Sequence, residues 1–195
     1  MLKVISRSAF DLRPVLQALA ESATRLCGAT RGHILQVDGE YLRFAAAYGA
    51  GPGFTEYLES HPVRLGSGSI AGRAASERRT IHSHDVLKET SYELIELIKQ
   101  QGYRTVLAVP MLREDVVLGV IVILKTNVAP FTDKQIALVE TFADQAAIAI
   151  ENVRLLDALR LRTDDLGRSV DELRALGEVS QAVNSTLDLE TVLST

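Results

Sequence analysis

The chain has 195 residues, 47% of them hydrophobic, which is enough for one domain with a packed core and some additional structure. Its 21 basic and 25 acidic residues are mixed along the chain and give a net charge of −4, so we expect neither a nucleic-acid surface nor an anionic-membrane surface. No apolar run approaches the roughly 20 residues that a membrane helix needs, and the N-terminus is too polar for a signal peptide, so a soluble cytoplasmic protein is expected.

The N-terminal part of the chain predicts a helix followed by a β-hairpin. Asp11 is a good N-cap residue, and Pro14 then falls in the first helical turn, where a missing N–H does little harm. Cys27 lies on the apolar stripe of this helix, and we interpret it as a small buried hydrophobe rather than a reactive thiol. Being the single cysteine, it excludes an internal disulfide and a cysteine-based zinc site. Apolar segments at 32–37 and 41–48 follow, and the Asp-Gly pair between them marks a hairpin turn.

The middle of the chain predicts short elements separated by loops. A helix is expected at 54–60, and an irregular stretch then leads to the run Gly-Ser-Gly-Ser at 66–69. This run lacks the Gly-Lys-Ser/Thr ending of a phosphate-binding P-loop, so we interpret one of its serines as the N-cap of a helix over 70–77. The N-terminus of that helix is nevertheless a possible anion site. A short strand at 80–83 and a helix at 91–101 complete the segment.

The segment 104–125 is the most apolar part of the chain. It predicts strands at 105–112 and 116–124 around a charged turn, and both strands are rich in Val, Ile and Leu. Because neighbouring strand residues face opposite sides, Leu118 and Val120 are expected on one face and Ile121 on the other. Neither face is polar, so this hairpin must be covered on both faces. Helices are expected to form one cover, and the nature of the other cover decides the function.

A long helix beginning at Thr132 or Asp133 closes the chain. Its first part carries apolar residues suited to packing on a sheet, and a narrow apolar seam with a spacing of seven residues follows, with Thr163 in one of its core positions. The seam predicts a two-stranded parallel coiled coil, and the alternative is a single helix folded back on its own domain. The expected homodimer interface consists of Leu156, Leu159, Leu166, Val170 and Leu173.

The order of these elements resembles that of a GAF domain. The likeness is carried by residues 10–32, 68–86, 103–125 and 131–156. The sequence of these segments is most similar to that of bacterial sensor proteins in which several such domains precede a histidine kinase or a nucleotide cyclase. The resemblance implies an α+β fold, an α/β sandwich of the GAF/PAS kind. In it an antiparallel sheet has helices on one face, a lid formed by about 50–103 covers a ligand pocket on the other, and flanking helices form a dimer.

The resemblance also divides the chain. We expect an N-terminal linker or helix at 1–10, a GAF domain at 11–155 and a signalling coiled-coil linker at 156–186. Residues 187–195 repeat the pattern that opens the first helix, so they are expected to begin a second, truncated GAF domain of a longer tandem protein.

Candidate ligand-binding residues follow from the same resemblance. A pocket built mainly from apolar groups with a few convergent polar ones is the usual site for a small molecule. The candidates are Tyr48, Ser69, Arg73, His82, Asp85, Tyr92, Ile98, Tyr103, Thr105 and Val120.

Several ligands and reactions known in this family are disfavoured. The Asn-Lys and Phe-x-x-x-Asp-Glu pattern of cyclic-nucleotide binders is incomplete, because Val128 follows Asn127 and no acidic pair follows Phe131. The single thiol is not placed for attaching a bilin pigment, and one cysteine cannot form and resolve the disulfide that free-methionine sulfoxide reductases use. His82 and His84 would share one strand face, but no third ligand for a metal or haem is apparent, so no cofactor is implied.

We therefore expect a non-catalytic regulatory sensor module. It binds a small cytoplasmic molecule, or has lost it, and transmits the change through a dimeric helix to a downstream effector domain in the same chain. The first alternative is a purely structural dimerisation spacer without a ligand. The second is an enzyme built on the GAF scaffold, against which the cysteine count speaks.

Overall fold

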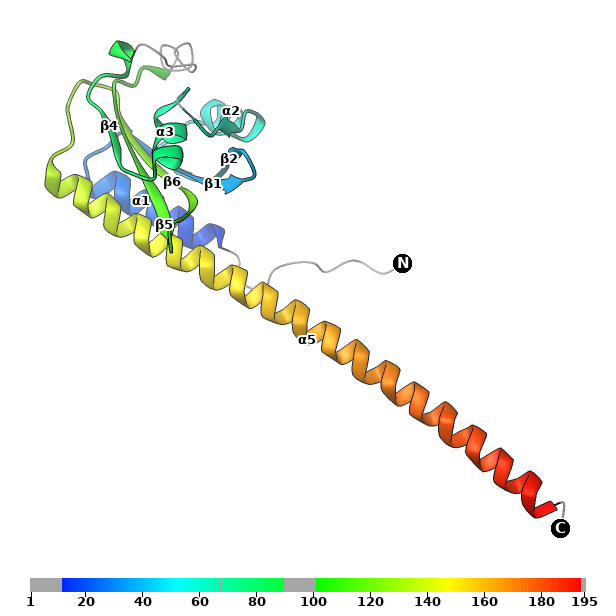
Figure 1. The fold of residues 1–195 in the computed structure, drawn as a ribbon. Coiled ribbons are helices and arrows are strands. Elements are labelled where there is room, and N and C mark those ends of the chain that lie inside the picture. The colour runs from blue at the N-terminus through cyan, green and yellow to red at the C-terminus, as the bar shows by residue number, and fades with distance from the viewer. Residues whose placement is uncertain (1–11, 67, 90–100, 194–195) are drawn as a thin grey trace. The chain divides into compact units, whose positions relative to one another are not determined.

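The computed structural model describes residues 12–66, 68–89 and 101–193. It divides into two compact units, Met1–Val153 and Arg154–Thr195. The first unit contains a sheet that is covered by helices on both faces (Figure 1). Within the described ranges, no helix is long and apolar enough to span a membrane.

The N-terminal elements match the prediction. Helix α1 (Arg13–Leu26) has Pro14 in its first turn, and the expected N-cap residue Asp11 lies outside the described residues. Strands β1 (Arg31–Asp38) and β2 (Tyr41–Tyr48) form an antiparallel hairpin. The turn between them contains Gly39 with φ +60°, which is why an Asp-Gly pair suits this position.

The middle segment contains one strand that the sequence does not predict. Helix α2 (Pro52–Ser60) is followed by β3 (Val63–Arg64), a two-residue strand that pairs with β2. Helix α3 (Ile70–Glu77), strand β4 (Ile81–Ser83) and the short 3₁₀-helix η1 (Val86–Lys88) come next. The helix predicted at 91–101 lies almost wholly outside the described residues.

The apolar hairpin has a neighbouring strand on each side and a core on each face, so the predicted cover on both faces is confirmed. Strands β5 (Thr105–Arg113) and β6 (Val116–Lys125) pair with each other, and β1 and β4 flank them. The antiparallel order of the six strands is β3-β2-β1-β6-β5-β4. The α+β sandwich expected from the resemblance is therefore confirmed.

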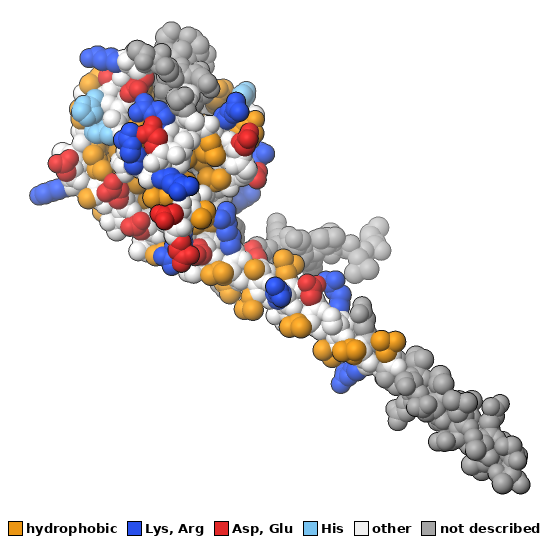
Figure 2. All heavy atoms as spheres, in the orientation of Figure 1, with side chains coloured by type: hydrophobic (Ala, Val, Ile, Leu, Met, Phe, Trp, Pro, Cys, Tyr) orange, Lys and Arg blue, Asp and Glu red, His pale blue; other side chains and the backbone are white. Residues whose placement is uncertain are grey.

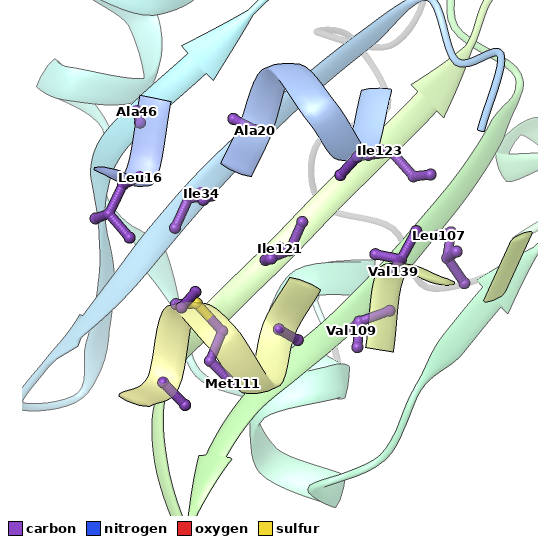
Figure 3. Packing of buried hydrophobic residues seen from close by; sticks show 14 of the residues in the cluster. Leu16, Ala20, Ile34, Ala46, Leu107, Val109, Met111, Ile121, Ile123 and Val139 are labelled. Atoms are coloured by element: carbon purple, nitrogen blue, oxygen red, sulfur yellow. The ribbon is translucent and has the colours of Figure 1, made fainter. Parts of the chain in front are cut away.

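Each face of the sheet has its own core. On one face, which we call the helix face, α1 and the first part of α5 (Asp133–Leu193) pack on the strands (Figure 3). On the other, the lid face, residues of α2 and α3 pack on the strands. The helix-face core includes Leu16, Ile34, Leu107, Val109, Ile121, Ile123 and Val139, and the lid-face core includes Leu35, Phe54, Ile70, Val106, Val120, Val122 and Leu124.

Two β-bulges change which side chains reach which face. A register shift in β5–β6 pairs Leu112 with Val117 and leaves Leu118 without a partner residue, so Leu118 joins the helix-face core instead of facing the lid with Val120 as alternation predicts. A second shift in the β1–β2 pair leaves Ala45 unpaired, and Tyr48 beyond it packs with the helix-face core.

Helix α5 begins with a reciprocal cap. The Gln135 backbone N–H donates to the Thr132 hydroxyl at 3.3 Å, while the Thr132 N–H donates to Gln135 Oε1 at 2.9 Å. The Gln135 side chain also donates to the Cys27 carbonyl at 2.8 Å, which joins the start of α5 to the end of α1. The predicted start at Thr132 or Asp133 is thus confirmed.

His33 is a buried polar residue on the lid face of β1. The residue is 6% exposed, and its ring meets Phe54 edge-on at a centroid distance of 5.6 Å. Burial lowers the pKa of His33 to about 4, because an imidazolium ion would lose its hydration there. The ring is therefore neutral at physiological pH.

Acid should destabilise the fold through His33. The pKa is about 4 in the folded chain against the ordinary 6.5, so as the pH falls the unfolded chain binds this proton first. Stability that is complete above pH 6.5 should be lost progressively down to pH 4, by about 3 kcal/mol. Urea unfolding across this range should show a loss in the wild type that is absent from His33→Leu, and parallel pH curves for the two proteins would contradict the prediction.

Gly119 should tolerate no side chain. A Cβ there would lie 2.2 Å from the Leu35 carbonyl oxygen and 2.3 Å from Met111 Cε. We expect Gly119→Ala to lower the free energy of unfolding by about 3 kcal/mol. The matched control is Gly53→Ala in α2, where a Cβ meets no atom within 4 Å and stability should stay level or rise slightly. Equal effects of the two variants in urea unfolding would refute the close-packing argument.

Candidate functional site: a small cavity under the lid

A small cavity of about 30 Å³ lies between the lid face of the sheet and the segments that cover it. The strands supply its floor, and α2, α3 and the chain before β5 supply its walls. The lining residues are His33, Leu35, Phe54, Leu58, Val63, Ser69, Ile70, Ala71, Tyr103, Val106, Val122 and Leu124. Most of these side chains are apolar, as is usual for a small-molecule pocket.

Aromatic contacts hold one wall of this cavity against the sheet. Phe54 of α2 lies between His33 and Tyr103, with ring centroids at 5.6 and 6.4 Å and edge-on geometry at both contacts. The Arg31 guanidinium lies 5.9 Å from the centre of the Phe54 ring and donates to Gln101 Oε1 at 2.9 Å. The position of α2 over β1 is therefore fixed largely by Phe54.

Three predicted site residues lie on this side of the sheet. Ser69 and Tyr103 line the cavity, and Val120 is fully buried in the lid-face core beside it. Ser69 also caps α3, because its hydroxyl accepts a hydrogen bond from the Gly72 N–H at 2.9 Å. The capping role predicted for one serine of the glycine-rich run is thus confirmed for Ser69.

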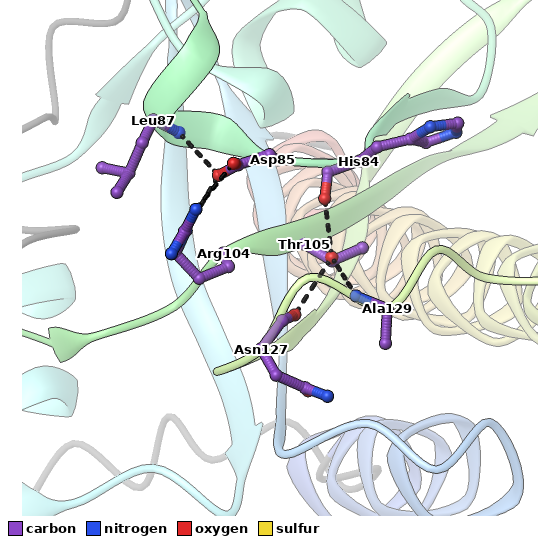
Figure 4. Close-up of polar contacts among 7 residues, drawn as sticks. All are labelled: His84, Asp85, Leu87, Arg104, Thr105, Asn127 and Ala129. Atoms are coloured by element: carbon purple, nitrogen blue, oxygen red, sulfur yellow. Dashed lines mark hydrogen bonds and ion pairs between the residues drawn. The ribbon is translucent and has the colours of Figure 1, made fainter.

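Asp85 and Arg104 form a two-bond ion pair beside the cavity rather than in its lining (Figure 4). Arg104 donates to the Asp85 carboxylate through Nε at 2.9 Å and Nη2 at 2.7 Å, and the Leu87 N–H donates to it at 3.3 Å. These bonds to Arg104 hold the pKa of Asp85 below its usual range. The pair joins η1 to the beginning of β5.

Thr105 is fully buried and ties together three segments (Figure 4). Its hydroxyl donates to the His84 carbonyl at 2.7 Å and, more weakly, to the Asn127 carbonyl at 3.2 Å. The same oxygen accepts a hydrogen bond from the Ala129 N–H at 3.1 Å. The loop after β4, the start of β5 and the connection from β6 to α5 therefore meet at one side chain.

Arg73 and His82 also make internal contacts. Arg73 pairs with Glu89 at 3.0 Å and with Glu77 at 3.7 Å, which links α3 to the chain after η1. His82 Nε2 accepts from the Phe131 N–H at 3.1 Å, and burial lowers the pKa of His82. Its ring lies 4.5 Å from that of His84, so the two rings are neighbours, but His84 follows the end of β4 and the predicted shared strand face is not formed.

The remaining predicted residues lie elsewhere. Tyr48 packs with the helix-face core because of the bulge at Ala45, so it does not line the cavity. Tyr92 and Ile98 lie outside the described residues. Among the residues that are described, no three metal-ligating side chains gather at one point.

Sequence reasoning missed most of the residues that line the cavity, among them its one histidine in the described lining. His33 and Phe54 are not among the predicted site residues, although both line the cavity. A histidine within the apolar strand segment at 32–37 was an available signal, because a polar ring in such a strand needs a partner. For Phe54 the only signal was its position in a short amphipathic helix.

The single thiol belongs to the helix-face core. Cys27 is fully buried, and its Sγ lies 3.6 Å from the Gln135 carbonyl oxygen, to which it donates. Burial raises the pKa of Cys27, so the thiolate needed for nucleophilic chemistry is disfavoured. The interpretation of Cys27 as a buried hydrophobe agrees with this environment.

Solved structures of similar fold come from several kinds of protein. The GAF domain of a phosphoenolpyruvate-protein phosphotransferase from Coxiella burnetii is 19% identical, with a TM-score of 0.68 over 77% of this chain and 88% of that chain. Residues 122 to 287 of a methyl-accepting chemotaxis protein are 23% identical, with a TM-score of 0.64 over 76% and 93%. A free methionine-R-sulfoxide reductase from Neisseria meningitidis, in complex with its substrate, is 18% identical, with a TM-score of 0.61 over 77% and 83%.

No curated protein matches the chain. At these identities the solved structures show a shared fold, and the family is shown by a sequence match. The family model for the GAF domain matches residues 11–151, which include the whole described sheet and its covering helices. The chain therefore belongs to the GAF domain family.

Proposed function

We propose that this GAF domain is a regulatory sensor module that binds a small molecule in the cavity and passes the change through α5 to an effector. The supporting observation is the position of the β5–β6 hairpin. Its lid-face side chains Val106 and Val122 line the cavity, while Val109 and Ile121 on its other face share a core with Val139 of α5. A shift of the hairpin would therefore change both the cavity and the packing of α5 on the sheet.

The hydrogen bonds of Thr105 support a second connection between lid and helix. They join the loop that carries His84 to the connection that leads from β6 into α5. The bond from the Phe131 N–H to His82 runs between the same two segments. A ligand uses such a connection only if it binds two arrangements of these segments with different affinity.

Dimerisation through the second unit is part of the proposal. Its seam residues are exposed in the single chain, with 63% for Leu159, 67% for Leu166 and 69% for Leu173. Figure 2 shows hydrophobic side chains at the surface of this helix among charged ones. Because apolar side chains at this spacing are stabilised by a second helix, we propose a homodimer whose paired helices carry the signal.

Known contexts of the fold agree with a regulatory role. The similar domains of the phosphotransferase and of the chemotaxis protein belong to larger proteins. The Neisseria reductase is an enzyme on the same scaffold, but a single buried thiol cannot form and resolve an internal disulfide. We therefore propose that the domain itself is non-catalytic.

A structural spacer without a ligand is the second candidate. The observation that favours it is the size of the cavity, since about 30 Å³ has room for little more than a water molecule. In that case the domain would serve only to space and pair the helices.

Native mass spectrometry of the purified protein separates the two candidates. The sensor proposal expects a dimer that carries a small-molecule adduct, or one that takes up a compound from nucleotide, amino-acid, aromatic and haem panels with a rise in Tm. A dimer without any adduct and without any thermal shift would leave only the spacer.

Charges in the seam should abolish the dimer. Leu159→Asp together with Leu166→Asp would bury carboxylates between the helices, so we expect monomers in sedimentation velocity. The control is Leu161→Asp, because Leu161 has a similar exposure, 66%, but lies off the seam, so this variant should leave the dimer intact. A dimer that survives the double substitution would exclude the coiled coil.

Removal of the Thr105 hydroxyl should loosen the entry to α5. Thr105→Val keeps the shape of the side chain but leaves the Ala129 N–H and the His84 carbonyl without this partner, at a cost of about 1–3 kcal/mol. Hydrogen exchange of the Ala129 amide should accelerate. Thr141→Val is the control, because that hydroxyl is exposed and donates only to the Ala137 carbonyl of its own helix. Unchanged exchange at Ala129 would show that Thr105 does not secure this connection.

A further inference from the structure

One residue of the cavity lining carries a buried polar atom without a partner in the described ranges. His33 Nδ1 is buried and has no hydrogen-bond partner among the residues that the structure describes. The whole residue is 6% exposed and lines the cavity. Buried polar atoms are nearly always hydrogen-bonded in native proteins, so an orphaned imidazole nitrogen beside a cavity indicates a partner from outside the chain.

Within the described part of the chain, the other lining residues carry no charged side chain. Val106, Val122 and Leu124 of the floor and Ile70 of the wall are hydrocarbon side chains, and no Lys, Arg, Asp or Glu is among the described residues that line the cavity. Two nearby pairs of charged groups neutralise one another, Asp85 with Arg104 and Arg73 with Glu89. Arg31 lies over the Phe54 ring of the wall and donates to the neutral Gln101 side chain. An ionic ligand would therefore lose its hydration here without a compensating charge.

We infer that the ligand is a small uncharged molecule with an apolar body and one hydrogen-bonding group, which pairs with His33 Nδ1. A neutral imidazole can donate through one nitrogen and accept through the other, so an alcohol, a phenol or a neutral N–H heterocycle matches it. Cyclic nucleotides, carboxylates and zwitterionic amino acids do not. This inference rests on the proposed sensor function and specifies the ligand class of that same cavity.

The size of the cavity adds a condition. With about 30 Å³ available, an occupant larger than a water molecule must displace part of the wall. Phe54 is the wall residue whose ring contacts His33, and it belongs to the short helix α2. Binding should therefore change the environment of Phe54 as well as that of His33.

Three probes of similar size test the class. Phenol is neutral with one hydroxyl, toluene lacks the hydrogen-bonding group, and benzoate is charged. We expect titrations of the full chain followed by NMR to show phenol binding at least about tenfold more tightly than toluene, and benzoate not binding. The imidazole nitrogen resonances of His33 and the ring resonances of Phe54 should shift with phenol.

Variants assign the preference to His33. His33→Leu should bind phenol and toluene with nearly equal affinity, and His33→Gln, which restores a neutral hydrogen-bonding group, should recover part of the preference. His84→Leu, which changes an exposed ring in the loop after β4, should leave it intact. Circular dichroism and unfolding curves of each variant confirm that the fold is retained.

The outcomes separate this inference from the sensor proposal. A phenol preference that persists in His33→Leu, or an ordered water on His33 Nδ1 that phenol does not displace in a crystal structure, overturns the inference. A charged compound that binds with shifts at His33 and Phe54 overturns it as well but leaves the sensor proposal standing. Failure of every compound, charged or neutral, to bind the wild-type chain overturns both.

Discussion

The fold depends on the need to remove both faces of the β5–β6 hairpin from water. Side chains such as Leu107 and Ile121 on one face and Val106 and Val122 on the other are 4% exposed or less. A sheet face of this composition is stable only under another layer, because exposing it would forfeit about 25 cal/mol for each Å² of apolar surface. The chain supplies one layer from its two ends, α1 and α5, and the other from its middle, α2 and α3. The cavity lies at the second of these junctions.

Polar residues near the cavity serve chiefly to join segments. Asp85, Arg73 and Thr105 are the kinds of residue that a ligand would engage, yet each is bonded to another part of the chain. Their partners are charged groups or backbone carbonyls that are themselves partly buried, so releasing them to a ligand would leave those partners unsatisfied. In the sensor that we propose, recognition would be left to the few polar groups of an otherwise hydrocarbon surface, and the apolar body of a ligand would be the main source of affinity.

The order and type of the elements could be predicted because short-range chemistry determines them. The Asp-Gly turn, Pro14 in the first turn of α1 and the Ser69 cap each act within four residues of the chain. The family resemblance then supplied the layers and the place of the cavity. The face of the sheet on which each side chain lies could not be predicted in the same way. A single bulge moves the side chains on one side of it along the strand to the opposite face.

Tyr48 and Leu118 illustrate this limit. Strict alternation assigns both to the lid, and the extra residue in each strand turns them to the helix face. His33 was not predicted as a site residue for a related reason. The identity of a strand residue does not say whether its polar atom has a partner across the sheet, since that depends on segments far away in the sequence.

The two outermost strands, β3 and β4, have two and three residues. Long, unpaired strand borders are the places where separate proteins join by backbone hydrogen bonds, and short ones leave few such groups to offer. The strands β3 and β4 are therefore poor templates for strand addition, but β3 covers only Tyr41 and Leu42 of β2, and β4 covers only Val106, Leu107 and Ala108 of β5. Where copies of the domain are crowded together, backbone pairing between their sheets is thus confined to the stretches of β2 and β5 that the two short strands leave uncovered.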